Sequence, residues 1–218
     1  MLLRFGLAPR RIGMGGAAFQ AYWKDTHAPV VRGMPGLALY HQNHAVLRDG
    51  EPLLPWPGFD ACAQFGAADG AAFDQAFSSP HYLGPVSTDA RQFVDTSLGG
   101  IVQCTQRLRQ GDTGAALGGR AVRLLSFLRL APLVPLPALE AALATLADPA
   151  RARGRELFIA VPTGQRVSLF EAVEVLGFDD ADAALAHVLG GEARHRNQSL
   201  TGLVRGTERL IAQVVTVV

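Results

Sequence analysis

The stretch FQAYWKDTHAP, residues 19–29, decides how the chain is built, because its spacing recurs 120 positions later as LEAALATLADP, residues 139–149. The first copy has Phe19, Trp23 and His27 before its proline, and the second copy has leucine, leucine and alanine at the matching positions. Residues four apart lie along one ridge of a helix. The repeated spacing predicts two structurally similar halves, with any polar chemistry concentrated in the first.

The composition predicts a soluble globular protein. The chain has 218 residues, 49% of them hydrophobic, and a chain of this size can remove about 70% of its unfolded surface from water. A net charge of +1, from 20 basic and 19 acidic residues, gives no basic face for nucleic acid. No apolar run approaches the roughly 20 residues of a membrane span, and the amino terminus lacks the apolar core of a secretion signal. These features predict a cytoplasmic location without a membrane partner.

Apolar periodicity predicts the order strand, helix, strand, strand, helix, strand in each half. In the first half the expected ranges are 2–8, 17–32, 37–47, 59–65, 70–77 and 98–109. In the second half they are 122–130, 137–146, 156–161, 166–176, 181–189 and 203–217. Within them, Phe73 and Phe77 correspond to Leu185 and Leu189, and Tyr40, His41 and Asn43 to Phe158, Ile159 and Val161.

This order is the ferredoxin-like motif, in which both helices lie on one face of an antiparallel sheet. The other face is left bare, so two such sheets can cover each other. We therefore expect an α+β fold with two ferredoxin-like β-α-β-β-α-β repeats packed sheet to sheet as an intrachain α/β barrel. The expected domains are residues 1–110 and 121–218, joined by a linker of small residues at 111–120.

The first half resembles the EthD family, a branch of the dimeric α/β-barrel superfamily. The residues that carry the resemblance are Phe19–Lys24, His27–Val31, Met34–Leu37, Tyr40, Gln42 and Asn43, followed by the polar ending Asp89, Phe93 and Asp95. The resemblance covers about residues 1–110 and implies a tandem duplication whose second half takes the place of a partner subunit. It implies a small-molecule enzyme acting by proton transfer, such as a dehydratase, cyclase, isomerase or cofactor-independent monooxygenase.

His27 is the expected catalytic residue. Its ordinary pKa near 6.5 suits general acid or base work on a carbonyl or hydroxyl compound. An alternative is structural: a histidine before Pro29 can bond a carbonyl left free by the missing proline N–H. Ala147 precedes Pro149 in the second half without an imidazole, which favours the catalytic interpretation. Three carboxylates are candidate partners of His27: Asp60, Asp95 and the nearby Asp25. Asp60 matches an acidic position of the family and is expected to be catalytic, and the choice of partner stays open.

Five further residues are expected to bind the substrate: Tyr22, Trp23, Tyr40, His41 and Asn43. Aromatic residues at helical spacing are more often core, so packing remains an alternative for Tyr22 and Trp23. Successive strand residues alternate faces, which places His41 and Asn43 on one face and Tyr40 and His44 on the other. The sequence does not say which face lines the barrel.

No metal site is expected, because His41 and His44 point to opposite faces of a regular strand. Haem stays open as a cofactor, since one histidine suffices as its ligand. Cys62 and Cys104 are expected to be free, buried thiols. The function these residues favour is turnover of a hydrophobic carbonyl compound, with aromatic and polyketide-like compounds as candidates. The alternative is a non-catalytic protein that binds a hydrophobic ligand or haem, and a homodimer is open in either case.

Overall fold

The computed structural model describes residues 1–54, 57–161 and 168–218. They form two compact units, Met1–Gln103 with Val214–Val218, and Cys104–Gln213. The division falls inside two long strands, β6 (Gly100–Gly111) and β10 (Val204–Thr216), each of which gives one end to each unit. No helix of the described residues is both long enough and apolar enough to cross a membrane.

The sheet of the first unit is antiparallel. β1 (Leu2–Ala8) pairs with β5 (Ala61–Ala67), which pairs on its other side with β2 (Leu39–Ala45). The register sets Leu2 opposite Ala67 and Leu39 opposite Gly66. Two-residue strands β3 (Leu47–Arg48) and β4 (Glu51–Pro52) form a separate hairpin.

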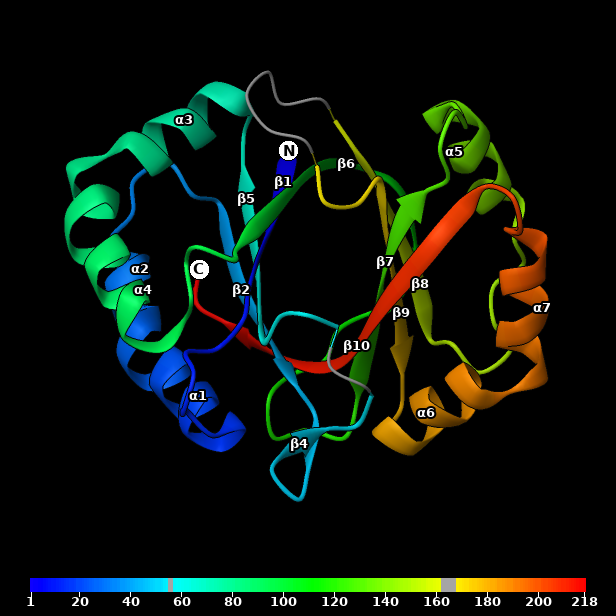
Figure 1. Cartoon of the computed structure of the whole chain (residues 1–218), viewed down its shortest axis with the longest axis horizontal. Helices are drawn as coiled ribbons and strands as arrows, with labels where there is room; N and C mark the ends of the chain where they lie inside the picture. The colour runs from blue at the N-terminus through cyan, green and yellow to red at the C-terminus, as the bar shows by residue number, and fades with distance from the viewer. Residues whose placement is uncertain (55–56, 162–167) are drawn as a thin grey trace. The chain divides into compact units, whose positions relative to one another are not determined.

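All helices of the first unit cover one face of this sheet (Figure 1). The expected helix 17–32 is confirmed as three consecutive segments: α1 (Gly16–Tyr22), a π-helical turn η1 (Trp23–His27) and α2 (Ala28–Arg32). α3 (Gly70–Ser78) also lies where the sequence predicts a helix. Between the expected helix 70–77 and the expected strand 98–109, where no element was predicted, the structure contains a π-helical turn η2 (Tyr82–Val86) and α4 (Ser87–Phe93).

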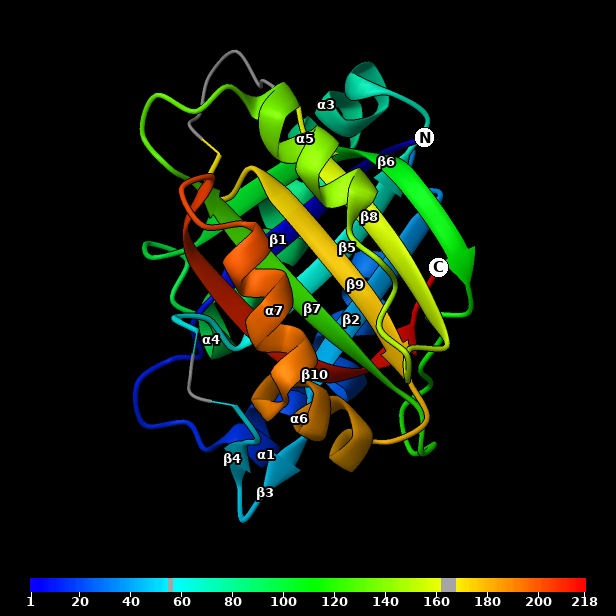
Figure 2. The same ribbon diagram turned by 90° about the vertical axis from the view of Figure 1, so that its right-hand side faces the viewer.

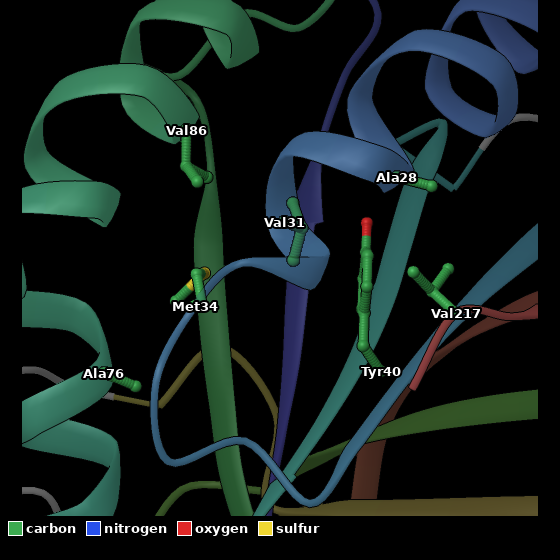
Figure 3. Packing of buried hydrophobic residues seen from close by; sticks show 7 residues of the cluster. All are labelled: Ala28, Val31, Met34, Tyr40, Ala76, Val86 and Val217. Carbon is green, nitrogen blue, oxygen red and sulfur yellow. The ribbon is translucent and has the colours of Figure 1, made fainter.

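Tyr40 on β2 joins the sheet to the helices. Figure 3 shows its ring between α2 and the carboxyl-terminal strand end, with Val31 and Val217 beside it. The buried cluster is completed by Ala28, Met34, Ala76 and Val86. Phe65 stacks on the Tyr40 ring at 4.8 Å between centroids. The backbone of Tyr40 also exchanges hydrogen bonds with Val217 and Val218, which fixes this edge of the strand.

The second unit repeats the arrangement with simpler helices. β10 pairs with β7 (Val122–Leu130), β7 with β9 (Ala172–Phe178), β9 with β8 (Gly154–Ala160) and β8 with β6, all antiparallel. α5 (Leu136–Thr145), α6 (Ala181–Leu189) and α7 (Gly191–Ser199) lie in front of these strands in Figure 2. The sequence analysis missed α7. The expected fold class, α+β with two ferredoxin-like repeats, is confirmed.

Matching helix caps align the two units. The carboxylates of Asp69 and Asp180 each accept a hydrogen bond from the backbone N–H three residues later, at 3.0 and 2.8 Å. The second helix of each unit therefore aligns at an offset of 111 residues, which matches Phe73 with Ala184, both fully buried. The expected match of Phe73 with Leu185 is wrong by one position.

The same caps correct the alignment of β2 with β8. Tyr40 lies opposite Phe65, four positions before the cap of α3, and Arg155 lies opposite Leu176, four positions before the cap of α6. Tyr40 therefore corresponds to Arg155, and the expected match with Phe158 is wrong. A sequence comparison had no fixed point inside the strand, whereas hydrogen-bond register provides one.

Candidate active site in the first unit

His27 ends a helical segment of unusual pitch. The segment Trp23–His27 is π-helical, and α2 continues directly from it with Pro29 in its first turn, where a missing N–H costs little. Short π-helical turns inside helices are frequent at functional sites. Phe19 and Trp23 are buried against the sheet, and their ring centroids are 5.7 Å apart, so the expected ridge is present.

The imidazole of His27 is bonded to a carboxylate. Its Nδ1 lies 2.6 Å from Oδ2 of Asp89 on α4, and Oδ1 of Asp89 accepts a hydrogen bond of 2.8 Å from the Tyr22 hydroxyl. Phe93, one turn further along α4, lies beside both rings, with centroids 4.8 Å from His27 and 5.3 Å from Tyr22. The bond to Asp89 replaces the carbonyl bond of the structural alternative.

This bond decides which nitrogen of His27 can act as a base. An ionised carboxylate only accepts hydrogen bonds, so Nδ1 carries the proton and Nε2 keeps a lone pair. Within the described ranges Nε2 has no hydrogen-bond partner, and the side chain keeps 9% exposure. Burial lowers the pKa of His27, although Asp89 opposes the effect. The imidazole is therefore neutral at pH 7 and can accept a proton at Nε2.

A second polar network lies behind His27. The side-chain amide of Gln42 donates to the carbonyl oxygen of Trp23 at 2.8 Å and to the Tyr40 hydroxyl at 3.0 Å. The indole N–H of Trp23 donates to the same hydroxyl at 3.1 Å. Because Tyr40 is fully enclosed, burial raises the pKa of its hydroxyl, which stays protonated. The network fixes Trp23, and with it the helical segment that carries His27.

His44 completes this network. Its Nε2 lies 2.9 Å from the amide oxygen of Gln42, and its ring stacks on Trp23 at 4.7 Å between centroids. An amide oxygen accepts, so the proton is on Nε2 of His44, and the buried Nδ1 finds no partner among the residues described. Burial lowers the pKa of His44 to about 4, and the nearby Lys24 adds to the effect.

The structure separates the expected substrate-binding residues. Tyr40 and His44 lie on the face of β2 that packs against the helices, whereas His41 and Asn43 lie on the other face. The Asn43 amide donates to the carbonyl oxygen of Cys62 at 3.0 Å, and His41 is half-buried. Tyr22 and Trp23 are both near His27.

Asp60 lies with Arg10 rather than with His27. One oxygen accepts from the Arg10 backbone N–H at 2.8 Å, and the other lies 3.6 Å from its guanidinium. The carboxylate on His27 is that of Asp89, which the sequence analysis quoted only as part of the family ending. The spacing of Asp89 and Phe93, one helical turn apart, was the signal for it, but no helix was expected between residues 77 and 98.

The described residues give no assembled metal site. Across residues 1–54, 57–161 and 168–218, no three His, Cys, Asp or Glu side chains are grouped so that they could hold an ion. Cys62 and Cys104 are free and buried, as expected, and burial raises the pKa of the Cys104 thiol to about 12. His27 offers one open nitrogen, a single ligand at most.

Comparison with known families bears on this geometry. The model of the EthD domain matches residues 11–97, a range that contains His27, Tyr22, Tyr40 and Asp89. The resemblance noted in the sequence is thereby confirmed for the first unit. No curated protein matches the chain.

Solved structures extend the likeness to both units. An anthrone oxidase-like protein superposes with a TM-score of 0.70 at 12% identity, covering 98% of this chain and 91% of its own. A proposed monooxygenase from Fusobacterium nucleatum gives 0.63 at 10% identity, with the same coverage of 98% and 91%. One from Lactobacillus acidophilus gives 0.55 at 10% identity, covering 100% and 94%. At these identities the likeness shows the fold.

Proposed function

We propose that this protein is a small-molecule enzyme of the EthD type and that Nε2 of His27 is its general base. The hydrogen bond between Nδ1 of His27 and Asp89 carries the proposal, because it leaves the other ring nitrogen open. A base works best when its neutral form is present at the working pH, and burial gives His27 that property. Asp89 orients the ring and stabilises the imidazolium that forms.

The surroundings favour an aromatic carbonyl substrate. Phe93 and Tyr22 place two stacked rings beside the imidazole, and rings of this kind bind flat apolar molecules. His27 would take a proton from an acidic carbon or hydroxyl of the substrate and return it elsewhere on the same molecule. Dehydration, cyclisation, isomerisation and cofactor-independent oxygenation share this first step. Tyr22 is proposed as a substrate contact, because its half-buried ring lies beside Phe93 and its hydroxyl shares Asp89 with His27.

Proton exchange tests the proposal before the natural substrate is identified. The probe is anthrone, whose methylene protons are acidic, and the measurement is loss of the methylene NMR signal in deuterated buffer. His27→Gln is expected to slow protein-dependent exchange by about 100-fold or more, the usual effect of removing a general base. The matched control is His195→Gln, an exposed histidine of the second unit.

Melting temperature separates the catalytic role from a structural one. We expect His27→Gln to melt close to the unmodified protein. Two results would refute the proposal. One is proton exchange by His27→Gln at an undiminished rate. The other is a large fall in its melting temperature, with exchange reduced only in proportion to the folded fraction. A Soret band on adding haem, lost in His27→Gln, would favour the haem-binding alternative.

A further inference from the structure

A small cavity lies within the second unit. It has a volume of about 30 Å³ and is bounded by α6, α7 and strands β7, β9 and β10. The rest of the lining is mostly leucine, and its polar residues are Ser126, Glu174, His187, Arg196, Asn197, Thr207 and Arg209. Since one water needs about 10–15 Å³ by this measure, the space holds about two water molecules or a group of that size.

Three arginines surround a single buried carboxylate here. Oε1 of Glu174 accepts from Nε of Arg155 and from Nη2 of Arg196, both at 2.7 Å. Arg155 also lies 3.3 Å from Asp148, a half-exposed carboxylate, and donates to the carbonyl oxygens of Leu143 and Leu146. Two arginines are thus matched by two carboxylates.

Arg209 is the third arginine, and it has no direct ion pair among the described residues. Its Nη2 donates to the amide oxygen of Asn197 at 2.9 Å, which is a neutral partner. No carboxylate of the described chain lies within ion-pair distance of it, because Glu192 instead lies 3.4 Å from His187 and accepts from the backbone N–H of Ala150. Burial lowers the pKa of Arg209, and the charge of Glu174 opposes this effect.

We propose that this cavity binds a small monovalent anion, either chloride or the carboxylate group of a small organic acid, with Arg209 as its principal ligand. A half-buried guanidinium without a direct ion pair is costly, and an anion in the cavity would offset that cost. The free N–H groups of Arg209 and the amide of Asn197 supply donors to it. The site belongs to the second unit and is independent of the chemistry proposed for His27.

Chlorine-35 NMR tests the site directly, since exchange of chloride with a protein site broadens its line. The unmodified protein is expected to broaden the line, and Arg209→Gln to abolish the effect, because losing a charge-assisted hydrogen bond weakens binding by about tenfold or more. Arg205→Gln removes an exposed arginine of the same strand and is expected to leave the broadening unchanged. Arg209→Lys retains the charge and is expected to retain weaker broadening.

Added acetate at constant ionic strength identifies the anion. If it narrows the chloride line, a carboxylate competes for the site, and if it does not, the site is for chloride alone. Absence of broadening by the unmodified protein, or equal broadening by Arg209→Gln, would overturn the proposal. If Arg209→Gln does not fold, Arg209→Lys provides the test. Broadening of the chloride line by Arg209→Lys that equals the broadening by Arg205→Gln would show that chloride binds elsewhere.

Discussion

In the first unit, α4 brings the carboxylate of Asp89 against His27; in the second, α7 brings the guanidinium of Arg196 against the carbonyl oxygen of Ala147 and against Glu174. The two segments match by burial, since Val86 at the end of η2 and Phe93 of α4 are buried seven residues apart, as are Ala193 of α7 and Leu200 just after it. Asp89 and Arg196 each stand three residues after the first of these pairs. One position in a shared fold thus has opposite charges in its two copies.

The difference teaches how one scaffold separates reactivity from stability. In the first unit the buried polar groups are mostly neutral, and one imidazole nitrogen is left open beside its carboxylate. In the second unit, Arg155 takes the place of Tyr40. Both Arg155 and Arg196 donate to Oε1 of Glu174, so this carboxylate is held between two buried guanidinium groups. Closed ion pairs in a low-dielectric interior hold a structure in one arrangement, whereas an open lone pair can react.

Glu174→Gln is expected to give the largest loss of stability. It leaves Arg155 and Arg196 buried without their shared carboxylate, and breaking such a cluster costs about 3–5 kcal/mol. Urea unfolding measures the loss. Glu208→Gln, on β10, is the control and should change the free energy of unfolding by about 0.5 kcal/mol or less. A loss below about 1 kcal/mol for Glu174→Gln would mean that the second unit does not depend on its ion pairs.

His44 is expected to make the first unit sensitive to acid. The pKa of His44 is about 4 in the folded protein, against 6.5 for a histidine exposed to water, which applies to the unfolded chain. The unfolded chain therefore binds the proton more readily. The contribution of His44 is therefore complete above pH 6.5 and falls as the pH drops toward 4, by about 3 kcal/mol. His44→Phe keeps the ring on Trp23 and should flatten the pH dependence of the unfolding free energy between these values. An unchanged slope would show that other groups cause the acid sensitivity.

Periodicity predicted most of the fold. The expected strand 2–8 and the expected helix 17–32 lie where the structure has them, because each alternates or repeats apolar residues at the period of its element. α4 and α7 were missed for a physical reason. α7 buries Ala193 and Arg196, so its buried face contains a charged residue and has no apolar stripe.

The candidate site was predicted in part. His27 and its aromatic neighbours were found because the two halves of the sequence differ at those positions. Asp89 was not chosen as the partner because it lies 62 residues from His27, and only the packing of α4 against η1 brings the two together. Sequence reasoning favoured Asp60, whose carboxylate holds Arg10 instead.

Tyr22→Phe is expected to have the smallest effect and to move the pKa of His27 in a direction that tests the comparison. Its hydroxyl donates to Asp89 and so withdraws part of the negative charge that favours a protonated imidazole. Removing the hydroxyl should raise the pKa of His27 slightly, whereas Asp89→Asn, which removes the charge itself, should lower it below its already depressed value. An NMR titration of the His27 ring carbon–hydrogen signals measures both shifts. Opposite shifts would show that the Asp89 carboxylate sets the basicity of His27. The second unit has Ala147 at the matching position and therefore has no imidazole to tune in this way. Shifts in the same direction would mean that burial alone controls the pKa of His27.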